Sequence, residues 1–405
     1  MNIIEKKCKK YSRSGIAAIA KKAGLYPYFK QISSEQGPIV NMAGRDIIML
    51  GSNNYLGMTG NPVVKEKALA AMEEFGVGTT GSRLLNGTFQ LHNELETRLA
   101  KFLGKDDCVV FSTGMQANLG AISCLLSHRD ENFLFSDELN HASIIDGVTL
   151  SKIERDKKII FKHNDMADLG EKIQQVPKKK SMIITEGIFS MEGDIPPLDE
   201  LVKIAKKYDA MIYLDDAHGV GVLGPEGRGA AAHFNVTKDV DVLMGTFSKS
   251  FASCGGYIAA NKDICNWVRH HARSFIFSAS VPPANCATVL AVLDLIEHDN
   301  SYRNKVLSIA DRMRNGLNDL GFEIGKSTTP VIPIIIGDDI KAFRFYKKLF
   351  HHKPRGVFTN PIRAPAVPEG RELIRTSYMA SMTEEMIDES LDIFSKVGKK
   401  MKIIS

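Results

Sequence analysis

The sequence predicts an α/β fold with a mostly parallel, seven-stranded sheet at the centre of a large domain. Short apolar segments recur along the middle of the chain, and segments with a helical spacing of apolar residues separate most of them. Short apolar strands that alternate with helices are typical of a parallel sheet buried on both faces. Ligands of such sheets bind at the carboxyl ends of the strands, where we expect functional residues. The predicted strands are 108–111, 132–135, 158–161, 182–185, 211–214, 242–244 and 257–259.

The segments outside this sheet predict a smaller α+β C-terminal domain and an N-terminal arm. A helical stretch follows the prolines at 282–283, and a strand–helix–strand pattern spans 331–358. We expect three parts, with residues 1–60 as the arm and a segment of the small domain, 61–286 as the large domain and 287–405 as the C-terminal domain. The basic segment 6–22 reads as a helix on the body or on a second subunit, or as a solvated arm; contact with a membrane surface is a third alternative.

Composition excludes several classes of protein. The 405 residues are 44% hydrophobic and 24% charged, which is typical of a globular protein with more than one domain. The net charge of +5 is spread along the chain, so we expect no nucleic-acid partner. Six scattered cysteines without a C-x-x-C pair predict reduced thiols in a cytoplasmic protein and no metal site. The sequence holds no apolar run near the ~20 residues that span a membrane.

Lys249 is the first candidate functional residue. It lies in Gly-Thr-Phe-Ser-Lys-Ser at 245–250, between apolar segments on both sides. A lysine in a crowded, partly dry turn has a lowered pKa and supplies the free amine that a Schiff-base nucleophile needs. Most lysines are solvated surface charges, so the interpretation depends on partners elsewhere in the chain.

Other strand ends supply such partners. The turn at 112–118 contains Gly114, which lets backbone N–H groups at a helix start face an anion such as a phosphate. His141 follows the next predicted strand, although a single histidine is more often structural. Asp215 ends a buried strand, where an acid is costly unless it meets a positive charge, and His218 follows it. A metal site at these two residues is less favoured, because the other strand-end loops hold no second cluster of ligands.

A lysine amine, a buried acid, a phosphate-binding turn and an imidazole at one sheet edge fit pyridoxal 5′-phosphate. Enzymes that use this cofactor bind it through a lysine Schiff base and place an acid or arginine at the pyridine nitrogen.

From about residue 26 to the C-terminal helix, the chain resembles the α-oxoamine synthases, a family of fold-type I pyridoxal-phosphate enzymes. The matching motifs are Gly-Thr-Thr-Gly-Ser-Arg-Leu-Leu-Asn-Gly-Thr (78–88), Phe-Ser-Thr-Gly (111–114), His-Ala-Ser-Ile (141–144), Phe-Ser-Met-Glu-Gly-Asp (189–194), Asp-Asp-Ala-His (215–218), Gly-Thr-Phe-Ser-Lys-Ser (245–250) and Phe-Ile-Phe-Ser-Ala-Ser (275–280).

The resemblance implies roles for the catalytic residues. Lys249 would hold the cofactor as a Schiff base and later act as the base on the substrate Cα. Asp215 would pair with the ring nitrogen, His141 would stack on the ring and His218 would contact the ring hydroxyl.

The resemblance also implies the binding residues. The phosphate would be held by the backbone of Gly114 and Met115, by the hydroxyls of Thr246 and Ser248, and by Ser278 of the partner subunit. Further cofactor contacts would come from Glu186 and Ser190. The amino-acid substrate would be bound by Arg375, which takes its carboxylate, by Asn54 and by Arg363 in a mobile loop.

The family condenses an amino acid with an acyl-CoA and releases CoA and CO2. Ser248 before the lysine and Thr-Thr-Gly-Ser-Arg at 79–83 favour the branch that uses L-serine and a long-chain acyl-CoA such as palmitoyl-CoA, in a homodimer with shared active sites. Asn53, where a tyrosine is common, and the altered loop 360–368 leave acyl length and amino acid open. The alternatives are 8-amino-7-oxononanoate synthase, 2-amino-3-ketobutyrate CoA ligase and, more distantly, an aminotransferase or a non-catalytic scaffold.

Overall fold

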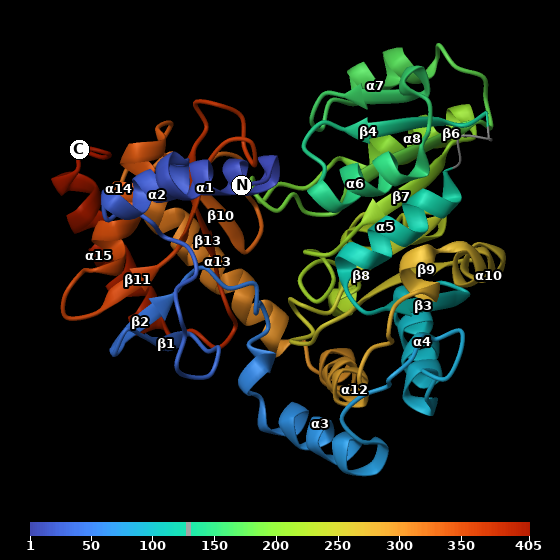
Figure 1. The fold of residues 1–405 in the computed structure, drawn as a ribbon, viewed down its shortest axis with the longest axis horizontal. Helices are drawn as coiled ribbons and strands as arrows, with labels where there is room; N and C mark the ends of the chain where they lie inside the picture. The colour runs from blue at the N-terminus through green and yellow to red at the C-terminus, as the bar shows by residue number, and fades with distance from the viewer. Residues whose placement is uncertain (127–130) are drawn as a thin grey trace.

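A computed structural model describes residues 1–126 and 131–405, and a seven-stranded sheet lies at the centre of the larger lobe (Figure 1). The strand order is β3-β9-β8-β7-β6-β4-β5. Only β9 runs antiparallel to its neighbours, so the predicted mostly parallel sheet is confirmed. The strands are β3 (Asp107–Phe111), β4 (Phe133–Asp137), β5 (Lys158–Phe161), β6 (Ser181–Glu186), β7 (Met211–Asp215), β8 (Val242–Thr246) and β9 (Gly256–Ala260).

Helices cover both faces of this sheet, because alternate strand residues point to opposite sides. Val110 and Leu214 pack on one face, and Val109 and Tyr213 pack on the other. The first face is covered by α4 (Gln90–Leu103), α7 (Met166–Ile173), α8 (Leu198–Tyr208) and α12 (Pro283–His298). The second face is covered by α5 (Gly114–Leu125), α6 (Ala142–Ser151), α10 (Lys262–His271) and α11 (Arg273–Ile276). This sandwich buries the sheet and leaves its strand ends free to carry polar residues.

The smaller lobe is built from both ends of the chain. The strands β1 (Ile39–Met42), β2 (Arg45–Met49) and β11 (Gly356–Phe358) form one sheet, and β10 (Val331–Ile335), β13 (Leu373–Ser377) and β12 (Asn360–Ile362) form an antiparallel one. Helices α13 (Ser301–Asp319), α14 (Asp339–Phe350) and α15 (Glu384–Lys400) pack against them. Because β11 pairs with β2, the N-terminal segment is tied to the C-terminal part.

The junction between the lobes includes α3 (Pro62–Phe75), which packs along α12. The side chains of α12 are buried in the core of the large sheet. The domain boundary after residue 286 remains a proposal. Shorter elements are α9 (Ala230–His233) and four 3₁₀ turns, η1 (Met58–Gly60), η2 (Arg155–Lys157), η3 (Pro225–Gly227) and η4 (Thr237–Asp239).

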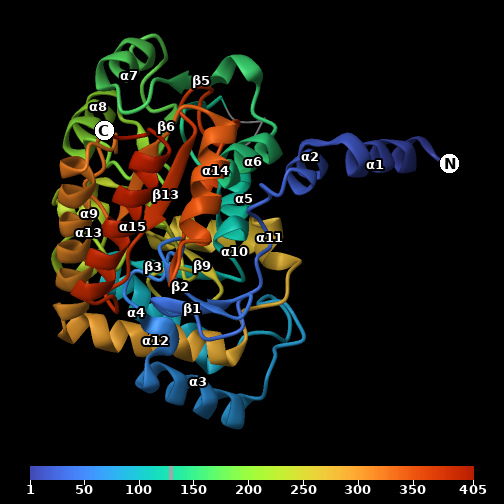
Figure 2. The same ribbon diagram turned by 90° about the vertical axis from the view of Figure 1, so that its left-hand side faces the viewer.

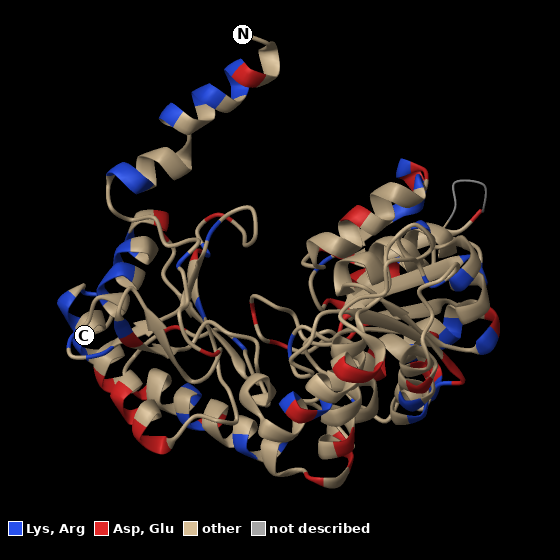
Figure 3. Cartoon of the chain, turned by 60° about the horizontal axis from the view of Figure 1, so that its bottom comes forward, with Lys and Arg blue, Asp and Glu red and all other residues tan. Residues whose placement is uncertain are grey.

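The N-terminal arm consists of two helices, α1 (Ile3–Ser14) and α2 (Ile16–Lys22), where the sequence predicted one. Neither helix has a buried residue, and the arm extends away from the body (Figures 2 and 3). Figure 3 marks the lysine and arginine positions in blue, and several of them lie along the arm. Among the described residues, no helix is long and apolar enough to cross a membrane.

Candidate active site

The carboxyl ends of the sheet strands surround a cavity of about 360 Å³. Its lining includes Gly114 after β3, His141 after β4, Glu186 at the end of β6, Asp215 at the end of β7 and Lys249 after β8. Parallel strands bring their carboxyl ends to one edge, which is why residues so far apart in sequence converge here. The predicted grouping of these side chains at one sheet edge is present in the structure.

Lys249 has the electrostatic setting of a reactive amine. Burial lowers its pKa to about 8, against the opposing effect of the carboxylates Asp215 and Glu186. The amine therefore loses its proton at a pH far below that of a solvated lysine. Glu186 is itself buried, and burial beside Asp215 raises its pKa well above the ordinary value.

Asp215 is held by a small hydrogen-bond network. Its Oδ2 accepts from Nδ2 of Asn118 at 2.7 Å, and its Oδ1 accepts from the backbone of Ala217 at 3.1 Å. Asn118 also donates to Ser143 at 2.8 Å and accepts from the hydroxyl of Tyr213 at 2.8 Å. The sequence predicted no role for Asn118, although its place one helical turn after Gly114 was a usable signal.

His141 caps the start of α6 and faces the cavity. Its Nδ1 lies 2.7 Å from the hydroxyl of Ser143, and its backbone N–H donates to Oε1 of Glu186 at 2.6 Å. Burial lowers the pKa of His141, while Asp215 opposes that effect. Both ends of the residue are therefore fixed, and the ring is presented to the cavity in its neutral form.

The other end of the cavity is shaped for a small anion. Gly114 begins α5, and a Cβ on it would lie 2.8 Å from Oγ1 of Thr246, so only glycine allows this close approach. Thr246 and Ser248 place their hydroxyls 3.0 Å apart beside it. The first N–H groups of a helix have no partners within the helix and favour a phosphate. The predicted residue Met115, also at this helix start, lines the same cavity.

Ser278 lies near this end but is not among the residues that line the cavity. Its hydroxyl accepts from Nε2 of Gln116 at 3.0 Å.

A second cavity, of about 480 Å³, adjoins the first and is lined by His141, His218, Lys249, Ser190 and Arg375. The guanidinium of Arg375 donates from Nε to the carbonyl of Ser190 and from Nη1 to Ser377 at 2.8 Å. Its buried Nη2 has no hydrogen-bond partner in the described protein. A buried donor left free in this way fits a carboxylate ligand, because an unpaired charged group is otherwise costly.

Two predicted substrate residues lie elsewhere. Asn54 donates its amide to Thr59 at 2.8 Å and to the carbonyl of Gln36, and its neighbour Asn53 lines the second cavity instead. Arg363 forms an ion pair with Asp339 at 2.9 Å and is not among the residues that line these cavities.

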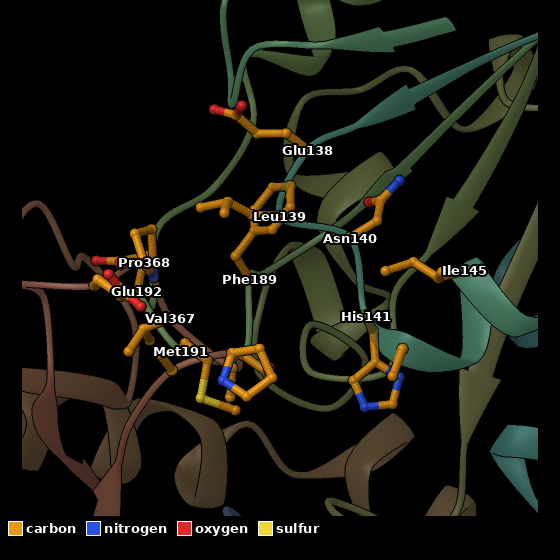
Figure 4. A pocket seen from close by; sticks show the side chains of 16 residues that line it. Glu138, Leu139, Asn140, His141, Ile145, Phe189, Met191, Glu192, Val367 and Pro368 are labelled. Carbon is orange, nitrogen blue, oxygen red and sulfur yellow. The ribbon is translucent and has the colours of Figure 1, made fainter. Parts of the chain in front are cut away.

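A third cavity, of about 610 Å³, opens from His141 toward the outside (Figure 4). Segments of both lobes form it, namely residues 138–145 and 189–192 from the large one and 364–369 from the small one. His141 lines all three cavities, so they meet at this residue.

Comparison with known proteins identifies the family. Residues 45–394 match the family model described as aminotransferase class I and II. A serine palmitoyltransferase from Bacteriovorax stolpii is 50% identical over 93% of this chain and 88% of that protein. An 8-amino-7-oxononanoate synthase from Thermoanaerobacter pseudethanolicus is 42% identical over 95% of this chain and 96% of that protein. The chain belongs to the α-oxoamine synthase family. The predicted resemblance is thereby confirmed.

The structure of this α-oxoamine synthase also matches a solved one. A serine palmitoyltransferase variant from S. paucimobilis with a bound pyridoxal-phosphate–myriocin aldimine superposes with a TM-score of 0.93 at 33% identity, and each chain covers 100% of the other. The protein is a pyridoxal-phosphate-dependent acyltransferase, and the first cavity fits that cofactor: an anion site lies beside Gly114 and a buried acid lies at Asp215.

Among the described residues no group of His, Cys, Asp and Glu could hold a metal ion. All six cysteines are unpaired.

Proposed function

We propose that this α-oxoamine synthase is a serine palmitoyltransferase. It condenses L-serine with a long-chain acyl-CoA such as palmitoyl-CoA and yields 3-ketodihydrosphingosine, CoA and CO2. The observation that carries the proposal is the meeting of three cavities at His141, one for the cofactor, one that presents the free Nη2 of Arg375, and one with apolar walls. Relatives named serine palmitoyltransferase support this choice of substrates.

The cofactor is held at both ends in this proposal. Lys249 would bind it covalently through Nζ, and Gly114, Met115, Thr246 and Ser248 would bind its phosphate. Because Asp215 is fixed by Asn118, its carboxylate would face the ring nitrogen and favour its protonated form. Pyridoxal phosphate, when bound, supplies an electron-poor ring that acidifies the Cα–H of an attached amino acid.

The remaining residues orient the substrate and move protons. Nη2 of Arg375 takes the amino-acid carboxylate, which a guanidinium binds with a defined geometry. The amine of Lys249, which is half deprotonated near pH 8 because its pKa is about 8, would take the Cα proton. His141 holds one face of the ligand and points a neutral imidazole toward the thioester oxygen. His218 would contact the ring hydroxyl. The carboxylate of Glu186 accepts from the backbone N–H of His141, and the carbonyl of Ser190 accepts from Nε of Arg375, so these two residues fix His141 and Arg375.

We further propose a cytoplasmic homodimer. Ser278, which does not line its own cofactor cavity, then serves the site of the neighbouring subunit, and Arg363 leaves Asp339 to reach the substrate. Asn54 fixes the loop beside the second cavity through its hydrogen bonds to Thr59 and to the carbonyl of Gln36, and Asn53 lines that cavity.

Release of free thiol from acyl-CoA tests this function. We expect release with serine and palmitoyl-CoA, and none after Lys249→Ala, which also removes the absorbance of the lysine-bound cofactor. A protein that transfers amino groups without releasing thiol contradicts the proposal. A second candidate, 8-amino-7-oxononanoate synthase, is favoured by the 42% identical relative of that name. It is separated from the first by a matrix of amino acids against acyl-CoA thioesters.

A further inference from the structure

The third cavity has an apolar wall along most of its length. Leu139, Ile145, Phe189 and Met191 come from the large lobe, and the proline-rich segment 364–368 of the small lobe lies across from them. In Figure 4, Glu138 lies at the top and His141 near the bottom of the labelled side chains. A volume of about 610 Å³ is large enough for an extended organic ligand.

The charged side chains of this cavity are all acidic. Among the described residues, Glu138, Glu192 and Glu369 line it, and no lysine or arginine does. Glu192 is paired with Arg371, with Nη2 and Oε2 3.1 Å apart. Within residues 1–126 and 131–405, Glu138 and Glu369 form no ion pair, and both are exposed. Two carboxylates without cationic partners therefore stand at the cavity.

An acyl-CoA extends in two directions from its thioester, with the CoA portion on one side and the alkyl chain on the other. The negative charge of the third cavity indicates which of the two portions it receives. The CoA portion carries several negative phosphate charges, which Glu138 and Glu369 repel. The described residues that line the second cavity include Lys30 and no acid, so this cavity is the more favourable side for the CoA portion. The alkyl chain carries no charge and gains by burial against Leu139, Ile145 and Phe189.

We infer that the third cavity receives the acyl chain and selects chains that end in a methyl group over chains that end in a carboxylate. This inference rests on the proposed acyl-CoA-dependent function and deepens it. A terminal carboxylate would enter an apolar cavity beside Glu138 and Glu369, where it finds no cationic partner and meets two like charges. The cavity thus favours acyl donors with an alkyl end over donors with a second carboxylate. The product 8-amino-7-oxononanoate has a terminal carboxylate, so its synthesis would need a donor of the second kind.

The test compares heptanoyl-CoA with pimeloyl-CoA, whose acyl chains have equal length and differ at the terminal carboxylate. Binding to the cofactor-loaded enzyme is measured by calorimetry without amino acid, and kcat/KM is measured by thiol release with serine. We expect heptanoyl-CoA to be favoured at least tenfold in both measurements. Equal values, or a preference for pimeloyl-CoA, overturn the inference.

Charge reversal identifies the residues responsible. In Glu369→Lys and Glu138→Lys, we expect the preference for heptanoyl-CoA to fall at least fivefold. Glu171→Lys, an exposed acid on α7 outside the three cavities, is the matched control and should keep the wild-type ratio. An unchanged ratio in both cavity variants overturns the assignment of these acids.

Failure of the proposed function gives a different result. In that case no acyl-CoA releases thiol with serine, whereas failure of the inference leaves release intact and removes only the preference between the two chains. If alanine alone supports release, the ratio is measured with alanine, and the inference is judged independently of the amino acid.

Discussion

The phenol oxygen of Tyr55 lies 2.6 Å from Nδ1 of His218, and both side chains are almost fully buried. Burial, with Lys249 and Arg375 nearby, holds the pKa of His218 well below its ordinary value. Burial also raises the pKa of Tyr55, so the phenol keeps its proton. Oδ1 of Asn53 is the other possible acceptor, but it lies 3.3 Å away, so we assign the hydrogen bond to the much closer Nδ1. The single ring proton of His218 therefore sits on Nε2, the nitrogen left to act as a donor.

Tyr55→Phe removes the donor that fixes this tautomer. The ring proton of His218 is then free to move to Nδ1, which turns Nε2 into an acceptor. We expect kcat/KM to fall about 10- to 100-fold, as is usual when an outer residue that orients a histidine is lost. The pH dependence of the cofactor absorbance should shift as well, which a purely structural role of Tyr55 would not cause.

Tyr346→Phe is the matched control. Tyr346 is another buried tyrosine, in the small lobe, whose hydroxyl contacts the carbonyl of Pro27 at 3.4 Å. Its substitution should leave both measurements at wild-type values. Identical behaviour of the two variants would contradict the role of Tyr55.

Arg375→Lys tests the carboxylate site. Lysine keeps the charge but loses the planar set of donors, so it cannot reach Ser190 and Ser377 and still direct a free N–H at the substrate. We expect the KM for serine to rise about 10- to 100-fold. This rise corresponds to the loss of one hydrogen bond to a charged group, which contributes about 1.5–3 kcal/mol. The KM for acyl-CoA, measured in the same thiol-release assay, should stay unchanged. A parallel rise in both constants would assign Arg375 a general structural role.

The sequence predicts the large sheet well because its information is local. Each strand is a short apolar run, and β4, β6, β7 and β8 end at a polar residue, such as Asp215 or Glu186, which the structure includes as the last residue of the strand. The sequence does not predict β12, because Pro361 argues against a strand and the pairing of Asn360 with Arg375 is distant in sequence. The prediction of a single helix in the arm is also wrong, because a break at Gly15 separates two helices.

The residues of the site also differ in whether local sequence predicts them. Lys249, Asp215 and His141 follow predicted strands, so their convergence can be deduced from the properties of parallel sheets. Tyr55 acts on His218 across 163 positions, and no local pattern marks it. The placement of Arg363 depends on a surface contact with Asp339, which is equally non-local.

The pKa of Lys249 predicts how cofactor attachment depends on pH. Burial lowers this pKa to about 8, so the amine is mostly protonated below pH 8 and mostly neutral above it. The rate at which apoenzyme binds pyridoxal phosphate covalently should rise with pH and reach half its maximum near pH 8. The absorbance change on mixing measures that rate, with Lys249→Ala as the blank. A rate that keeps rising to pH 10 would mean that the lysine behaves as a solvated one.

His163 joins three segments near the site. Its Nδ1 lies 3.0 Å from Oδ1 of Asp137 at the end of β4, and its Nε2 lies 2.9 Å from Oδ2 of Asp194. Burial favours the neutral ring, but the two carboxylates outweigh it and raise the pKa of His163 to about 10. The imidazolium therefore fixes the loop that carries Ser190 and Glu192, both of which line cavities of the site.

Replacement of His163 by glutamine should lower stability in a pH-dependent way. The histidine pKa is about 6.5 in the unfolded chain and about 10 in the folded protein. The charged form stabilises the fold fully below about pH 6.5, and this contribution is lost as pH rises toward 10. We expect His163→Gln to cost about 2 kcal/mol at pH 6, less than a fully buried pair because the ring is partly exposed. The cost should be much smaller at pH 10.

Thermal unfolding at both pH values measures this cost. The control is His233→Gln, which replaces an exposed histidine on α9 and should show no such difference. Equal destabilisation at pH 6 and pH 10 would show that the charge of His163 is not what holds the loop.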